Sequence, residues 1–325
     1  MAARGQRPRS GVNRLRFGIQ GSGQLVDGSP DPGFFRAVAE LAEDLGYDSL
    51  WAGDHISFHN PIVDITVALS TFAARTERIT IGAGILLLPL RHPSLVAKEF
   101  ASLDYVSGGR LVLGVGVGGE GRGDFSAVGV LIGERGARAD EAMLALRELF
   151  RGPPASFAGE FFRFEDVRIE PTSTQPGGPP LWVGGRSSAA LRRAGRLGDG
   201  WMPIWVSPER FERGWQEVRR QAREAGRDPD PLVPAVVLPT RVEDDAAQAE
   251  ARLADHLSRR YGMTVAPEVV RRYCLAGSPE ECAKRVRAYV RAGARHVIFN
   301  LGASPDEFHR QCELLFSGVA TGVAS

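Results

Sequence analysis

Short apolar runs alternate with amphipathic stretches along most of the chain. The runs are rich in branched side chains and show little polar alternation, which is typical of strands buried on both faces of a parallel sheet. They lie at 16–20, 49–52, 79–87, 110–117, 181–184, 200–204, 233–238 and 296–301. The pattern therefore predicts eight buried strands.

The stretches between these runs have helical periodicity. Phe34, Val38 and Leu45 fall on one face of a helix that Gly46 would end, since glycine readily adopts the left-handed conformation. Ser278-Pro-Glu-Glu281 is a capping box, and Gly293 would end that helix. Further helices are predicted at 64–75, 94–106, 134–150, 187–196, 207–225, 243–261 and 304–316.

Eight strands, each followed by a helix, predict an α/β fold of the TIM (β/α)8 barrel class. The alternative is an open doubly wound sheet with a small second domain. We expect a tail at 1–14, a single domain over 15–320, and a β-hairpin at FAGEFFRFEDVRIEP, before Pro171. Insertions, which usually surround the active-site mouth of a barrel, are predicted at about 118–133, 152–180 and 262–278.

Composition narrows the class of protein. A length of 325 residues suggests two domains, but barrels commonly use this length for one. Lys and Arg total 40 and Asp and Glu 39, so neither nucleic acid nor a membrane is an expected partner. The basic start lacks the apolar region of a signal peptide. Three cysteines without a C-x-x-C pair favour the reduced cytoplasm.

Gly114-Val-Gly-Val-Gly-Gly119 matches the G-x-G-x-x-G pattern of dinucleotide-binding sites. A helix should follow such a motif, and the segment GEGRGDF follows here. We interpret the glycines instead as a strand end where backbone lies close to something flat or bulky.

His55 follows the second strand directly, with Asp54 beside it. The carboxyl end of a barrel strand is where catalytic groups lie, and a carboxylate can orient an imidazole. The alternative is a loop histidine without a catalytic task. His59 lies four residues on, but Glu does not follow His55, so no metal site is predicted.

Pro180-Leu-Trp-Val-Gly-Gly-Arg-Ser-Ser188 passes from a strand into a helix. The free N–H groups of a helix start, together with Arg186 and Ser187, form a candidate anion site. A serine-capped helix without a ligand is the alternative. Arg91, Asp104 and Arg110 are expected in salt bridges at the bottom of the barrel, and the Arg-rich stretches 207–225 and 252–260 on solvated helix faces.

Four segments together resemble the bacterial luciferase-like superfamily of flavin- and deazaflavin-dependent oxidoreductases. They are LGYDSLWAGDH (45–55), ERITIGAGILLLPLRHPSLVAKEFASLDYVSGGRLVLGVGVG (77–118), ERGARADEAMLALRELF (134–150) and PPLWVGGRSSAALRRAGRLGDGW (179–201). The likeness extends over roughly 16–316 and implies a TIM barrel with its cofactor at the carboxyl-terminal mouth.

The resemblance also implies roles for individual residues. A bulge in the third strand, often with a non-prolyl cis peptide, would back the flavin ring at Gly84-Ile85. Gly184, Gly185, Arg186 and Ser187 match the phosphate-binding turn, and Gly116 faces the same mouth. The W-x-x-D-H motif of Trp51 to His55 is similar to that of members using coenzyme F420, which would make His55 and Asp54 catalytic. Glu120 is a candidate acidic partner of His55.

The resemblance implies hydride transfer between coenzyme F420 and a small organic substrate. One alternative is an FMN-dependent monooxygenase that acts with reduced flavin; another is a non-catalytic cofactor-binding protein on the same fold. A homodimer is expected, and a separate flavin or F420 reductase would supply electrons. Substrate selectivity is expected from the loops at 20–32, 56–64, 119–133 and 155–170.

Overall fold

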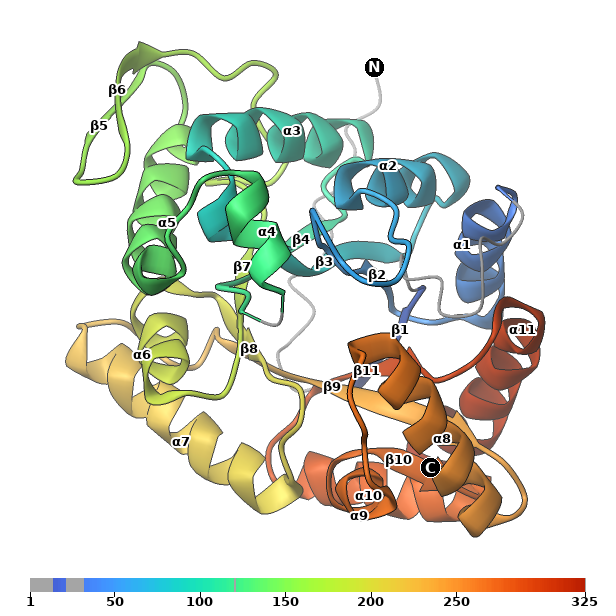
Figure 1. Ribbon diagram of the computed structural model, residues 1–325. Coiled ribbons are helices and arrows are strands. Elements are labelled where there is room, and N and C mark those ends of the chain that lie inside the picture. Colours follow the sequence, from blue (N-terminus) through green and yellow to red (C-terminus); the bar gives the residue numbers. More distant parts are fainter. Residues whose placement is uncertain (1–13, 22–31, 120, 325) are drawn as a thin grey trace.

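A computed structural model describes residues 14–21, 32–119 and 121–324. Residues 1–13 of the tail expected at 1–14 and the candidate Glu120 lie outside these residues. In the described part, parallel strands form a closed barrel ringed by helices (Figure 1). The barrel strands are β1 (Arg16–Gln20), β2 (Ser49–Ala52), β3 (Thr80–Leu87), β4 (Leu111–Gly116), β7 (Leu181–Gly184), β8 (Gly200–Met202), β9 (Val233–Val242) and β11 (His296–Leu301).

Closure of the barrel is seen in the strand pairing. β1 pairs with both β2 and β11, and β9 pairs with both β8 and β11. Every one of these pairs is parallel, and the strands are buried along almost their whole length. The TIM-barrel prediction is confirmed, and the open doubly wound alternative is wrong.

The helices lie where the periodicity predicts them, with boundaries that differ by a few residues. Gly46 and Gly293 follow their helices with φ of +89° and +103°, and the Ser278 capping box is formed. The helices are α1 (Phe34–Leu45), α2 (Ile65–Arg75), α3 (Pro93–Val106), α4 (Arg122–Ala127), α5 (Arg135–Arg151), α6 (Ser188–Leu197), α7 (Pro208–Glu224), α8 (Ala246–Tyr261), α9 (Pro267–Tyr273), α10 (Pro279–Arg291), α11 (Pro305–Leu314) and α12 (Thr321–Ala324), with short turns of other helix types at η1 (Leu88–Leu90), η2 (Ile132–Glu134) and η3 (Leu315–Ala320).

Three short elements interrupt the regular alternation. The predicted hairpin is present as β5 (Ala155–Ala158) and β6 (Arg163–Val167), antiparallel and outside the helix ring (Figure 1). β9 is longer than predicted because β10 (Leu275–Gly277) pairs with its carboxyl end. The short helix α4 was not predicted from the sequence.

The lower end of the barrel holds two of the three charged residues expected there. Asp104 accepts hydrogen bonds from the backbone N–H and side-chain amide of Gln175. Arg110 donates to Thr76 Oγ1 and to the carbonyl of Ile79, among others. Arg91 was expected beside them and lies instead at the other end, after β3. No described helix is both long and apolar enough to cross a membrane.

Candidate active site

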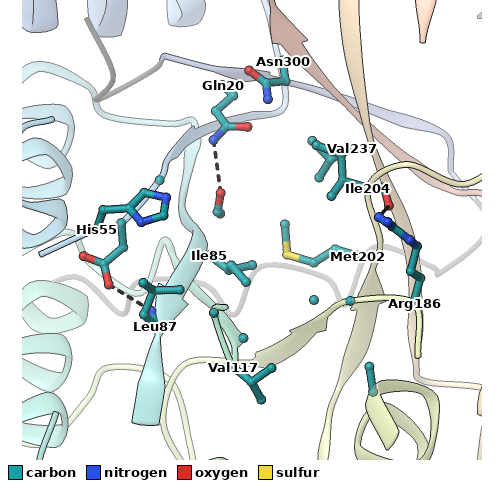
Figure 2. Close-up of a pocket in the computed structure, with 18 of the residues that line it drawn as sticks. Gln20, His55, Ile85, Leu87, Val117, Arg186, Met202, Ile204, Val237 and Asn300 are labelled. Atoms are coloured by element: carbon teal, nitrogen blue, oxygen red, sulfur yellow. Dashed lines mark hydrogen bonds between the residues drawn. The ribbon is translucent and has the colours of Figure 1, made fainter. Parts of the chain in front are cut away.

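A pocket opens at the carboxyl ends of the barrel strands (Figure 2). Its volume is about 250 Å³. Every site residue predicted from the sequence lines it: Asp54, His55, Gly84, Ile85, Gly116, Gly184, Gly185, Arg186 and Ser187. Four strands, β2, β3, β4 and β7, thus bring these residues to one cavity from positions far apart in the chain, and β1 and β11 add Gln20 and Asn300. The insertion at 152–180, which includes the selectivity loop expected at 155–170, contributes no lining residue, contrary to the sequence-based expectation.

The third strand is irregular where the family resemblance predicts it. Its register with β4 shifts between Ala83 and Leu86, and the Gly84-Ile85 peptide is cis. The side-chain amide of Gln20 donates to the Gly84 carbonyl over 3.1 Å. The bulge turns Ile85 into the pocket, where Figure 2 shows it next to Met202.

The glycines of the neighbouring strands make room for Ile85. A Cβ on Gly116 would lie 1.9 Å from Ile85 Cδ1, and one on Gly184 would lie 3.0 Å from the same atom. The bare backbone at these two positions therefore accommodates a side chain of the chain itself. The bulky group that lies against the backbone of Gly116 and Gly184 is thus Ile85, which forms the surface there.

Asp54 is paired with Arg91 and not with the adjacent His55. Both oxygens of this fully buried carboxylate accept from the guanidinium, over 2.6 and 2.9 Å, and Oδ2 also accepts from the Leu87 N–H. A bidentate pair of this kind fixes both side chains. Asp54 thus ties the end of β2 to the segment after β3, and the expected bottom salt bridge of Arg91 is wrong.

The carboxylate that contacts His55 comes from helix α4. Asp124 Oδ2 lies 2.8 Å from Nδ1 of His55, while Oδ1 accepts from the N–H groups of Ile56 and Ser57. Asp124 is 1% exposed, and the imidazole stacks on Phe58 with ring centroids 4.0 Å apart. With Nδ1 engaged, Nε2 is the nitrogen available for chemistry in the pocket.

The predicted anion-binding turn connects β7 to α6. Gly185 has φ +101°, and its carbonyl accepts from the indole N–H of Trp201 over 2.9 Å. Ser187 caps the helix by accepting from the Ala190 N–H, and Arg186 reaches the Ile204 carbonyl over 3.3 Å. Ser187 is thus a helix cap as well as a lining residue, and the start of α6 lines the pocket together with Arg186.

Four lining or supporting residues were missed from the sequence: Gln20, Asp124, Arg260 and Asn300. Gln20 is the last residue of a buried strand and Asn300 the last but one of another, which is a usable signal for a barrel mouth. Asp124 lies in a predicted insertion without any local pattern. Arg260 is 4% exposed, although the stretch 252–260 was expected on a solvated face, because the last turn of α8 faces the pocket.

Comparison with known families agrees with this geometry. A family model described as luciferase-like monooxygenase matches residues 16–296. The chain belongs to the luciferase-like monooxygenase family. It is accordingly an enzyme of the oxidoreductase class.

Three similar proteins illustrate the range of this luciferase-like family. An uncharacterised protein of Mycobacterium tuberculosis is 34% identical over 60% of this chain and 73% of its own. The F420-dependent glucose-6-phosphate dehydrogenase of Kineococcus radiotolerans is 28% identical over 83% of this chain and 87% of its own. The crystal structure of monooxygenase RslO1 from Streptomyces bottropensis superposes with a TM-score of 0.82 at 24% identity, covering 94% of this chain and 99% of that one. The similar proteins therefore include F420-dependent enzymes as well as monooxygenases.

Proposed function

We propose that this luciferase-like chain is an oxidoreductase that transfers a hydride between coenzyme F420 and a small organic substrate. The observation that carries the proposal is the His55–Asp124 pair at the pocket wall. A buried carboxylate on Nδ1 favours the tautomer with its proton on that nitrogen and stabilises the imidazolium when Nε2 takes a proton. His55 would accept or donate the proton that accompanies hydride transfer.

The residues present fit a phosphate-bearing ring coenzyme. The turn at Gly185, Arg186 and Ser187 would hold the phosphate, and Ile85 would lie against the ring. When bound, F420 supplies the carbon that accepts or releases a hydride. The apolar walls formed by Met202, Ile204 and Val237 would keep water from the reacting atoms.

An arginine-lined pocket next to the phosphate turn favours F420 over FMN. Arg186, Arg210, Arg213 and Arg272 line a second hollow, which has a volume of about 440 Å³. Within the described residues, none of the four is ion-paired with a carboxylate. FMN ends at its phosphate, whereas F420 continues into a tail of carboxylates. The arginines would bind that tail by long-range attraction.

Titration of the protein with each coenzyme, followed by quenching of tryptophan fluorescence, tests this assignment. We expect F420 to bind more tightly than FMN, and the double variant Arg210→Gln/Arg213→Gln to raise the Kd for F420 by about tenfold, since each exposed contact contributes about 0.7 kcal/mol. FMN binding should not change. Arg223→Gln, an exposed arginine farther along α7, is the matched control.

Tight binding of FMN with none of F420 would contradict the proposal and favour the alternative, a monooxygenase that uses reduced flavin. Oxygenation of a substrate would then depend on FMN and on a reductase. A salt-independent Kd for F420 would contradict the role given to the arginines, because attraction between exposed charges is screened by salt.

We also propose that the protein is a homodimer and lies in the cytoplasm, and that a separate reductase supplies the coenzyme with electrons. Helix α3 supports the dimer, because Leu95 and Val106 lie three turns apart on one face and are 63% and 72% exposed. Replacement of Leu95 by Glu should convert a dimer to a monomer in light scattering. A separate reductase is proposed because the glycine segment 114–119 lies at the end of barrel strand β4 and not in the βαβ unit that a dinucleotide-binding motif opens.

A further inference from the structure

Arg260 places a buried positive charge in the candidate active site. It lies in the last turn of α8, is 4% exposed and lines the pocket with Asn300 and Tyr261. Its Nη1 donates to Asn300 Oδ1 over 2.8 Å. Its Nε is buried and has no hydrogen-bond partner among the described residues.

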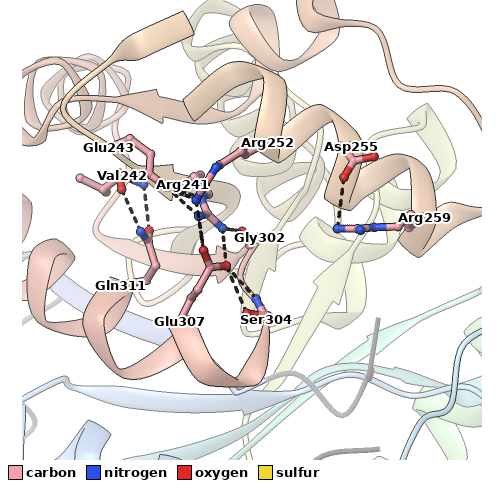
Figure 3. A network of polar contacts seen from close by, with 10 residues as sticks. All are labelled: Arg241, Val242, Glu243, Arg252, Asp255, Arg259, Gly302, Ser304, Glu307 and Gln311. Atoms are coloured by element: carbon pink, nitrogen blue, oxygen red, sulfur yellow. Dashed lines mark hydrogen bonds and ion pairs between the residues drawn. The ribbon is translucent and has the colours of Figure 1, made fainter. Parts of the chain in front are cut away.

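Two other buried arginines of this chain, Arg193 and Arg241, are neutralised by carboxylates. Arg193 lies 2.5 Å from Asp140, and Arg241 pairs with Glu243 and Glu307 (Figure 3). In the part of the chain that the structure describes, no carboxylate forms an ion pair with Arg260. Its charge is therefore left uncompensated by the carboxylates of the residues that the structure describes.

Two described neighbours of Arg260, His256 and Tyr261, add no negative charge beside it. His256, one turn earlier on α8, is buried, and burial followed by the charge of Arg260 lowers its pKa to about 3. This histidine is neutral at physiological pH. The contact with Tyr261, whose ring centroid lies 5.8 Å from the guanidinium carbon, is a cation–π interaction and leaves the charge in place.

An unpaired buried charge is destabilising, and an oxyanion bound beside it would remove that cost. The Nε–H and Nη2–H groups share one edge of a guanidinium, which matches the two oxygens of a carboxylate or phosphate. No hydrogen bond of Arg260 within the described residues uses that edge. The edge is thus available to a bidentate oxyanion in the pocket.

We propose that the substrate of this enzyme carries a carboxylate or phosphate group, which binds to Arg260 beside Asn300. The inference rests on the proposed function in so far as that function places the substrate in this pocket. Figure 2 shows Asn300 beside Gln20, on a different side of the pocket from Arg186. The oxyanion of the substrate and the phosphate of the coenzyme would therefore occupy separate positions.

The test uses the full chain without coenzyme and compares benzoate with benzamide, a neutral molecule of nearly the same shape. Binding is followed by tryptophan fluorescence, because Trp205 contacts Tyr261 with ring centroids 5.9 Å apart. We expect benzoate to bind at least tenfold more tightly than benzamide. Inorganic phosphate in competition with benzoate then distinguishes the two oxyanions: displacement at comparable concentration indicates a site for either group, and its absence a carboxylate site.

Variants show which residue causes the preference for benzoate over benzamide. Arg260→Gln should abolish it, whereas Arg259→Gln, which removes the same charge from the neighbouring position paired with Asp255 (Figure 3), should leave it unchanged. Asn300→Asp keeps Arg260 in place but pairs it with a carboxylate, and it should abolish the preference without truncating the arginine. This variant keeps the test valid if Arg260→Gln does not fold, as judged by circular dichroism.

Equal binding of benzoate and benzamide by the unaltered protein would overturn the inference. A preference that persists in both Arg260→Gln and Asn300→Asp, or that is lost in Arg186→Gln but kept in Arg260→Gln, would also overturn it. So would a Kd for F420 that Arg260→Gln raises as much as Arg186→Gln does. Failure of F420 to bind the unaltered protein would instead overturn the proposed coenzyme, because the benzoate comparison does not use it.

Discussion

Asp124 and His55 lie 69 positions apart in the chain, yet the carboxylate is 2.8 Å from the imidazole. Helix α4 and the loop after β2 meet over the barrel mouth to form this pair. The same carboxylate holds two backbone N–H groups of the loop, so it fixes both the ring and the segment that bears it.

Asp124→Asn should preserve the shape of the loop and release the imidazole. Because asparagine keeps one oxygen for the backbone N–H groups but no negative charge, we expect the Nδ1–H tautomer of His55 to lose its predominance. Nitrogen-15 NMR of the imidazole measures this directly. In turnover assays with a panel of alcohols and aldehydes, kcat should fall by about 10- to 100-fold, with the Kd of the coenzyme unchanged. An unchanged tautomer would contradict the orienting role.

Asp54 and Arg91 should behave as a structural pair. Asp54→Asn leaves a largely buried guanidinium without its carboxylate, so the free energy of unfolding should fall by about 3–5 kcal/mol in urea titrations. Replacing both partners, as Asp54→Leu/Arg91→Met, should restore most of that loss because no buried charge remains. Additive losses in the double variant would contradict the pairing.

Gly116→Ala should disturb the site through Ile85. The added Cβ would meet Ile85 Cδ1 at 1.9 Å, so we expect a loss of about 1–3 kcal/mol in stability and weaker coenzyme binding. The double variant Gly116→Ala/Ile85→Ala should regain the stability lost to the clash. Gly133→Ala, where nothing lies within 4 Å of the added atom, is the control. Equal losses of stability and of coenzyme binding in Gly116→Ala and Gly133→Ala would show that the contact with Ile85 is unimportant.

Acid should destabilise the protein through His296. This residue is buried against Ser49, whose Oγ lies 2.6 Å from Nε2, and burial lowers its pKa from 6.5 to about 3. The unfolded chain takes up a proton below pH 6.5 that the folded chain excludes, so stability is lost as the pH falls from 6.5 toward 3.

His296→Gln should reduce the slope of unfolding free energy against pH by about 1.4 kcal/mol per pH unit between pH 6 and pH 4. Urea titrations at several pH values measure this slope. His309→Gln is the control, because that side chain is 64% exposed and should leave the slope unchanged. An equal slope in the unaltered protein, His296→Gln and His309→Gln would contradict the assignment of this pH dependence to His296.

The barrel itself follows from the sequence. Runs such as 79–87 and 296–301 are apolar without alternation, and only strands covered on both faces accommodate such runs. Glycines after amphipathic stretches mark helix ends because their positive φ is sterically unfavourable for other residues, as Gly46 shows. The position of the site also follows, since polar residues directly after buried strands meet at one end of a barrel.

The partners of the side chains depend on tertiary structure. Sequence proximity suggests that Asp54 serves His55, but successive residues after a strand point in different directions, and each carboxylate pairs with a cation from another segment. Likewise, composition places Arg260 on a solvated helix face, and only the packing of α8 over the barrel mouth buries it. The local pattern of apolar, polar and glycine positions determines the helices and strands, because it acts between residues that are close in the chain. Charge pairing acts through space, and barrel closure determines which groups become neighbours.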